Sequence, residues 1–227
     1  MSKKRPFIDP KKLQRFHSIT DFNPVRCFEH LELEPILNRI LHENKNEQFR
    51  MSLTNYLIIR TISMFENYMS NKAQQLVDKA DLDITILFKE EIVIPTSLFN
   101  LVKEHVTKGK IVGMSYNFAN LDEVNEVFSK LLNINYFDAI LQKHRNEDEM
   151  NETFRYFDRA IEICKNWKNV KKMFELRTDI VHSMAYPKLS NRAIISFVDS
   201  LMVFMDYGTN FIEPKSQFVQ NLIRNRK

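Results

Sequence analysis

Glycine and cysteine are scarce in this chain of 227 residues, which contains 3 Gly and 2 Cys. Two cysteines are too few for a disulfide framework, and three glycines leave little room for the glycine-rich loops that bind phosphate. Proline is absent from residues 36–94 and from residues 96–186. Since proline interrupts helices and glycine weakens them, these shortages favour an all-helical fold.

The sequence also lacks the long apolar segments that membrane insertion and secretion require. It has no run of about 18 or more apolar residues, and no apolar segment follows its basic start as in a secretory leader. We therefore expect a cytoplasmic protein with no membrane partner. Hydrophobic residues still make up 44% of the chain and include 18 Phe, which predicts a well-filled core.

Most enzyme signatures are missing as well. The chain has no glycine-rich phosphate loop, no serine on a strand-to-helix elbow and no cysteine pair at metal-binding spacing. The six histidines are scattered, so a zinc site would need ligands from distant segments. We therefore expect neither a metal nor another cofactor.

Basic residues gather at the two ends of the chain. The net charge is +4, six Lys and Arg against one acid lie in the first 20 residues, and three of the last four residues are basic. Prolines and sparse apolar residues lead us to interpret residues 1–24 as a loosely ordered arm. Residues 25–227 are interpreted as a single helical domain. Basic ends suit an anionic partner such as a nucleic acid, and they suit solubility equally well.

Apolar residues recur at spacings of three and four along most of the chain, which predicts amphipathic helices. The strongest patterns cover residues 46–79, 152–182 and 190–208. The expected fold is all-α, an antiparallel bundle of four to five long helices with short additional elements. Shorter patterns predict further helices over residues 25–44, 96–108, 120–132 and 135–142.

Polar residues and glycines predict where several of these helices begin and end. Asn120 and Ser190 stand where a side chain accepts a hydrogen bond from the first free backbone N–H groups. Gly109 and Gly208 stand where a left-handed residue ends a helix. Residues 110–118 are therefore expected to form a connector.

An arginine and a histidine lie at the end of the predicted helix over 152–182, in the segment ELRTDIVHSMAYP. On a regular helix five positions correspond to about 500°, so the side chains of Arg177 and His182 diverge by roughly 140° unless the helix ends between them. Ser183 can bond to nearby backbone, and Pro187 disfavours helix at the preceding residue. We expect the chain to unwind near His182 and to bring both side chains to one side.

This pair is chemically suited to cleave a phosphodiester without a metal. His182 can accept or donate a proton near neutral pH, and Arg177 supplies a fixed positive fork that binds phosphate oxygens. RNA carries its own nucleophile, because the 2′-hydroxyl can attack the adjoining linkage and leave a 2′,3′-cyclic phosphate and a 5′-hydroxyl. The protein would then need only to position the RNA, deprotonate the 2′-hydroxyl and neutralise the charge on the phosphate.

The segment RTDIVH is an R-x4-H sequence, and here the chain resembles the HEPN superfamily, whose ribonuclease members carry an R-x4-6-H motif. The segment YLIIRTISMFENYM is similar to the first long core helix of that family, and LRTDIVH is similar to the third. The final apolar helix fits the same pattern. The resemblance covers roughly residues 45–212, and the chain is similar to the RiboL-PSP-HEPN and defence-associated HEPN families.

The resemblance implies a metal-independent endoribonuclease in which Arg177 binds the scissile phosphate and His182 is the general acid and base. It implies a homodimer in which two Arg–His sets face one cleft, and a role as a toxin or anti-phage effector with an antitoxin or regulatory partner. The family often has Asn, Asp or His directly after the arginine, whereas this chain has Thr178 followed by Asp179. Both are expected to support the site.

Two further side chains are candidates near this site. Glu66 either holds Arg177 or the motif loop in place, or pairs with Arg60 or Lys72 on the surface. Tyr186 is the candidate for stacking on an RNA base, because it lies close to the motif in sequence. Trp167, at helical spacing, is expected to be a core residue instead.

Two other functions remain open. The first is a non-catalytic HEPN module that binds RNA, a nucleotide or a partner protein. The threonine after the motif arginine motivates this hypothesis. The second is a helical interaction protein in which Arg177 and His182 bond to the free carbonyls at a helix end. In that case, replacing His182 by alanine would lower the stability by about 1 kcal/mol and alter no activity.

Overall fold

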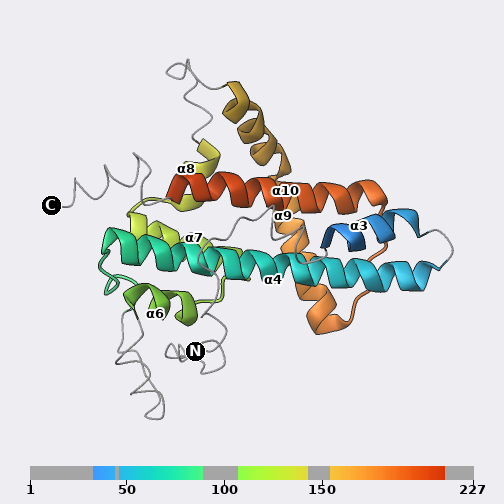
Figure 1. Ribbon diagram of the computed structural model, residues 1–227, viewed down its shortest axis with the longest axis horizontal. Coiled ribbons are helices and arrows are strands. Elements are labelled where there is room, and N and C mark those ends of the chain that lie inside the picture. The colour runs from blue at the N-terminus through green and yellow to red at the C-terminus, as the bar shows by residue number, and fades with distance from the viewer. Residues whose placement is uncertain (1–32, 44–45, 89–106, 143–153, 213–227) are drawn as a thin grey trace, which may run out of the picture. The chain divides into compact units, whose positions relative to one another are not determined.

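The computed structural model describes residues 33–43, 46–88, 107–142 and 154–212, and only the backbone of residues 154–166 and 206–211. These described residues form α-helices and no strand (Figure 1). The prediction of an all-α fold is therefore confirmed, and the bundle arrangement stays a prediction. The helices are α3 (Leu33–His42), α4 (Glu47–Ala80), α6 (Lys108–Ser115), α7 (Leu121–Leu132), α8 (Tyr136–Gln142), α9 (Phe154–Ser183) and α10 (Asn191–Ile212).

The two longest helices, α4 and α9, begin and end within one or two residues of their predicted bounds. The predicted arm over residues 1–24 and most of the predicted helix over residues 96–108 lie outside the described residues. Over the described part of the chain, none of the helices combines the length and the apolar character needed to cross a membrane.

Two helix starts follow the predicted capping residues. The Asp122 N–H donates to the Oδ1 atom of Asn120 at 2.9 Å, and the Ala193 N–H donates to the Oγ atom of Ser190 at 3.2 Å. Each side chain satisfies a backbone donor that has no partner inside the helix. Asn120 and Ser190 are therefore confirmed as caps of α7 and α10.

Gly109 does not end a helix, and this prediction is wrong. Gly109 lies in the first turn of α6, and this helix continues through Ser115, into the stretch 110–118 that we expected to be a connector. Its N–H donates to Oδ1 of Asp78 on α4 at 2.8 Å. A Cβ atom at this position would lie 2.3 Å from the carbonyl oxygen of Gln74, also on α4. Glycine is needed here because α6 approaches the backbone of α4 closely.

Gly208 does not end α10 either, because the helix continues to Ile212. None of the glycines in the described residues has a positive φ, the conformation that would end a helix. A glycine inside a helix lowers its stability by about 1 kcal/mol without interrupting it. Burial of Ile212, which is 1% exposed, favours continuing the helix past the glycine.

The chain divides into two compact units. The described residues of the first unit are 67–88, 107–139 and 209–212, and those of the second unit are 33–66 with gaps, 140–142 and 154–208. α4 contributes residues to both units. In the first unit, the ring of Phe128 lies 4.9 Å from that of Tyr136 and 6.3 Å from that of Phe118. The interpretation of residues 25–227 as one domain stays a prediction.

An aromatic cluster joins α4, α9 and α10 in the second unit. The ring of Phe65 meets Phe174 edge to face, with 5.1 Å between centroids, and lies 6.0 Å from Phe204. Trp167 lies 5.2 Å from Phe204 and remains half-buried, with the Lys171 ammonium above its ring at 5.7 Å. Such contacts add to the burial energy and fix the rotation of α9 about its axis.

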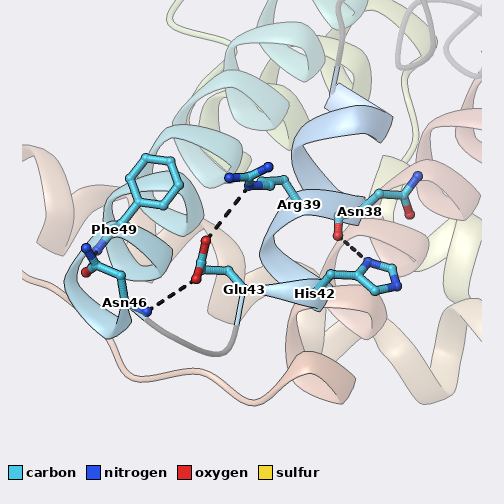
Figure 2. Close-up of polar contacts among 6 residues, drawn as sticks. All are labelled: Asn38, Arg39, His42, Glu43, Asn46 and Phe49. Atoms are coloured by element: carbon cyan, nitrogen blue, oxygen red, sulfur yellow. Dashed lines mark hydrogen bonds and ion pairs between the residues drawn. The ribbon is translucent and has the colours of Figure 1, made fainter.

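Polar side chains at the end of α3 and the start of α4 form hydrogen bonds with nearby backbone in the second unit (Figure 2). The Asn46 N–H donates to Oε1 of Glu43 at 3.2 Å, and Oδ1 of Asn46 accepts from the Phe49 N–H at 2.9 Å. Asn46 therefore caps α4. At the end of α3, Nδ1 of His42 lies 2.7 Å from the Asn38 carbonyl oxygen. This is a helix-end contact of the kind that a histidine near free carbonyls makes.

Candidate functional site

The R-x4-H motif lies within the last turns of α9. The helix continues through Ser183, so Arg177 and His182 belong to one uninterrupted helix. We expected the helix to end between them, and this expectation is wrong. Pro187 restricts only the residue directly before it, and the serine hydroxyl does not prevent one more helical residue.

The chain leaves α9 one residue later, at Met184. The φ of Met184 is 49°, in the left-handed region, which is uncommon for a residue with a side chain. The Ala185 N–H then donates to the Asp179 carbonyl oxygen at 3.5 Å. The helix end that carries His182 is thus closed by a left-handed residue and a backbone hydrogen bond, as at many helix ends.

Because α9 stays regular, Arg177 and His182 point to different sides of it. Their directions differ by roughly 140° about the axis. Arg177 is half-buried and shares the side of α9 that carries the buried residues Phe174 and Ile180. His182 is exposed and lies two turns after the exposed Glu175. Within one chain, the cationic fork and the imidazole therefore do not face the same point.

The two residues that follow the motif arginine are both exposed. The hydroxyl of Thr178 donates to the Phe174 carbonyl oxygen at 3.0 Å, one turn back in the helix. Its only donor is therefore used within α9, and its oxygen can still accept. Asp179 stands one turn before His182, where a carboxylate can orient an imidazole. The supporting roles of both residues stay predictions.

Tyr186 is the most exposed aromatic side chain in this region, with 57% of its surface accessible. It lies two residues after Met184, which is 82% exposed. On α4, Tyr56 is 47% exposed and directly follows Asn55, the residue that bonds to Ala185. The hydrogen bond from the Asn55 side chain to the Ala185 carbonyl oxygen therefore places both exposed tyrosines near the end of α9.

Asn55 is a residue of this site that the sequence analysis missed. Its Nδ2 atom donates to the Ala185 carbonyl oxygen at 2.9 Å, across 130 positions of sequence. Asn55 is only 9% exposed, and in the described part of the chain its Oδ1 atom has no hydrogen-bond partner. Leaving a buried acceptor unpaired costs about 1–3 kcal/mol, whereas one ordinary hydrogen bond contributes about 1 kcal/mol.

The rest of the segment between α9 and α10 is held by the start of α4. Arg50 donates to the Leu189 carbonyl oxygen at 2.9 Å and to Oδ1 of Asn191 at 2.6 Å. The ammonium of Lys188 pairs with Glu47 at 2.9 Å, between exposed side chains. Together with Asn55, three residues of α4 therefore contact three of the seven residues that follow α9.

For Glu66, also on α4, two roles were left open: holding Arg177 or the motif loop, or pairing with Arg60 or Lys72 on the surface. Glu66 lies eleven residues after Asn55 on the same helix, which corresponds to roughly 16 Å along the axis. Glu66 is half-buried and follows Phe65, whose ring contacts Phe174. The observed contacts to residues 184–190 come from the first part of α4, and the role of Glu66 stays a prediction.

One signal in the sequence points to Asn55. It lies three and seven positions before Ile58 and Ile62, both buried, so it shares the apolar side of α4. A polar side chain on a core-facing side needs a hydrogen-bond partner, because buried polar groups are almost always paired. The identity of that partner could not be predicted, since it lies in a segment far away in sequence.

No group of three or more His, Cys, Asp or Glu residues among those described is placed to hold a metal ion. Neither a family model, nor a curated protein, nor a solved structure matches this chain. Function is therefore inferred from the residues of the motif, from their placement in α9 and from the segment that follows.

Proposed function

We propose that the chain is a metal-independent endoribonuclease of HEPN type. The observation that carries this proposal is the placement of His182 in the R-x4-H motif, exposed in the last turn of α9 and close in sequence to the exposed Tyr186. An exposed imidazole can reach a substrate and exchange protons with solvent between turnovers.

The proposed reaction divides the chemistry between substrate and protein. The 2′-hydroxyl of RNA attacks the adjoining phosphorus, His182 accepts its proton, and the 5′-oxygen leaves with a proton returned to it. A 2′,3′-cyclic phosphate and a 5′-hydroxyl result. Arg177 stabilises the charge that builds on the phosphate oxygens, and Tyr186 stacks on a neighbouring base.

A homodimer fits this reaction better than a monomer does. Since Arg177 and His182 diverge by roughly 140° on one helix, a single chain does not direct both at one phosphate. A two-fold partner would supply a second copy of each, and residues of the two chains would then face each other across the symmetry axis. The cleft would also gain positive charge that attracts RNA.

The decisive experiment compares the wild type with His182→Ala on RNA in the presence of EDTA. We expect fragments with cyclic phosphate ends from the wild type and none from His182→Ala, because removing the imidazole removes the proton acceptor. His42→Ala is the matched control, since His42 is also an exposed histidine in the last turn of a helix. It should cleave at the wild-type rate.

Two results would contradict this proposal. Cleavage by His182→Ala at the wild-type rate would exclude the imidazole from the chemistry. Absence of cleavage by folded wild-type protein, across diverse RNAs and together with candidate regulatory partners, would exclude the nuclease. Equal urea midpoints for the three proteins would show that folding is not the variable, as we expect for exposed side chains.

The second candidate is a non-catalytic HEPN module that binds RNA, a nucleotide or a partner protein. The hydrogen bond from Thr178 to the Phe174 carbonyl oxygen favours it, because the donor beside the motif arginine is not directed to a ligand. Binding of RNA without turnover, weakened equally in Arg177→Ala and His182→Ala, would support this candidate. A biological role as a toxin or defence effector with an antitoxin partner is part of the leading proposal.

A further inference from the structure

The end of α9 is attached to α4 through Ala185, the second residue after the helix. Its N–H donates to the Asp179 carbonyl oxygen at 3.5 Å, and its carbonyl oxygen accepts from Nδ2 of Asn55 at 2.9 Å. Both polar groups of this peptide position are thus engaged, one by α9 and one by α4. Ala185 lies three residues after His182, so this attachment fixes the helical turn that carries the imidazole.

Asn55 makes this attachment in an unusual way. The amide must direct its NH₂ group toward the Ala185 carbonyl, because only that group can donate. Its oxygen is then left buried and unpaired among the described residues. The cost of desolvating an unpaired acceptor exceeds the net gain from one ordinary hydrogen bond, so the amide does not repay its burial in stability.

The other contacts to this segment are different in kind. Lys188 and Glu47 form an exposed ion pair, which contributes little and is screened by salt. Arg50 binds the far end of the segment, at Leu189 and Asn191, next to the start of α10. Asn55 alone among these residues of α4 contacts the part of the segment that adjoins His182.

We propose that Asn55 is a positioning residue for His182. Through the Ala185 carbonyl it holds the last turn of α9 in place, and so it sets the orientation of the imidazole and of the neighbouring Tyr186. This inference rests on the proposed ribonuclease function where it concerns turnover, and on the hydrogen bond alone where it concerns the placement of His182.

Two substitutions test the proposal in opposite ways. Asn55→Asp keeps the shape of the side chain. At a pH above the pKa of the introduced carboxyl, it places a carboxylate oxygen against the Ala185 carbonyl oxygen, and the hydrogen bond is lost. At lower pH that carboxyl is protonated and can donate to the same carbonyl, so the bond re-forms. Asn55→Leu removes the donor and the unpaired acceptor together, at every pH.

We expect Asn55→Leu to lower kcat roughly tenfold or more at nearly unchanged KM, because small misplacements of catalytic groups are costly. Its urea midpoint should equal or exceed that of the wild type. Asn55→Asp should show the same loss at pH 8, and the ratio of its rate to the wild-type rate should recover as the pH falls toward 5. Asn169→Asp is the matched control, because Asn169 bonds to Ser196 and Ser200 away from this segment.

A second measurement does not depend on turnover. The NMR signal of the His182 imidazole, assigned by its absence in His182→Gln, should shift or broaden in Asn55→Leu at every pH, and in Asn55→Asp at pH 8 more than at pH 5. It should not change in Asn169→Asp. If the wild type cleaves no RNA, the proposed function fails, and the positioning role is judged from this signal.

The proposal is overturned by either of two results. One is an unchanged His182 signal in both Asn55 variants. The other is a loss of kcat in the Asn55 variants that parallels their loss of stability and that appears to the same degree in Asn169→Asp. That pattern would indicate general destabilisation.

Discussion

Tyr116 shows how burial changes the chemistry of a single side chain in the first unit. Its hydroxyl donates to the Leu87 carbonyl oxygen at 2.8 Å. Burial raises the pKa of Tyr116 from 10.0 to about 12, and the nearby carboxylates of Glu126 and Glu123 add to this effect. Burial also raises the pKa of Tyr136. Both hydroxyls are therefore held in the neutral form by the folded chain.

This pKa shift predicts how stability depends on alkaline pH. Below pH 10 the hydroxyl of Tyr116 is neutral in both the folded and the unfolded chain, and its contribution to stability is complete. Between pH 10 and about 12 the unfolded chain loses this proton first, so the free energy of unfolding falls. In Tyr116→Phe this fall should be smaller, although the variant is less stable at pH 7 by about 1 kcal/mol for the lost hydrogen bond.

Urea unfolding of both proteins at pH 7, 9 and 11.5 would measure this difference. The wild type should be the more stable protein at pH 7, and between pH 9 and 11.5 its free energy of unfolding should fall by more than that of Tyr116→Phe. Parallel pH profiles would show that Tyr116 is not held neutral by the fold.

Gly109 must be a glycine because the backbone of α4 lies against it. An added Cβ would lie 2.3 Å from the Gln74 carbonyl oxygen on α4, which cannot move without the helix. At Gly113 the nearest atom, at 2.5 Å, belongs to the Gln74 side chain, which can rotate away. Gly109→Ala should therefore lower the free energy of unfolding by about 1–3 kcal/mol, and Gly113→Ala should lower it less.

Thermal unfolding of the two variants checks this prediction. Alanine gains about 1 kcal/mol over glycine in helix propensity, so Gly113→Ala should come close to the wild-type melting temperature. Equal losses in the two variants would contradict the distinction between a backbone neighbour and a side-chain neighbour.

At the scale of the element, the end of α9 depends on a left-handed residue that is not glycine. Met184 has a φ of 49° and is 82% exposed, so its side chain contributes little packing. A residue with a Cβ in this conformation costs about 1–2 kcal/mol. Glycine avoids this strain, but the greater conformational freedom of glycine in the unfolded chain offsets part of the gain. Met184→Gly should raise the free energy of unfolding by up to about 1 kcal/mol.

Met184→Ala provides the matched control for that substitution. It removes the exposed side chain and keeps the Cβ, so its stability should stay near that of the wild type. Urea denaturation measures both variants. A gain in Met184→Ala equal to that in Met184→Gly would show that the side chain, and not the backbone conformation, limits stability.

The bounds of α4 and α9 could be predicted from sequence because helical periodicity is a local property of the chain. The exact end of α9 could not, since Ser183 and Pro187 are compatible with several ending points. Gly109 was interpreted as a helix end because its local context permits that. The approach of α6 to Gln74 on α4, which decides the matter, is a contact between distant segments.

At the scale of the whole molecule, the divergence of Arg177 and His182 leads to a prediction about assembly. If each site takes its arginine from one chain and its histidine from the other, Arg177→Ala and His182→Ala should complement each other in mixed dimers. Half of the dimers formed by random mixing are mixed, and one of their two sites is intact. Roughly a quarter of the wild-type activity should therefore return.

Unfolding the two variants together and refolding the mixture provides this test. Each variant refolded alone is the control and should stay inactive. If the mixture is also inactive while the refolded wild type is active, both residues of a site come from one chain, and the arginine side chain must reach around α9.

The sequence by itself determined the all-α class, the two long helices, the caps at Asn120 and Ser190, and the R-x4-H motif. These features depend on residue type and on spacings of a few positions, which act within one helix. Tertiary structure decided which residue of α4 holds the segment after α9 and how closely α6 approaches α4. The bond between Asn55 and Ala185 joins positions 130 apart, and only folding brings such positions together.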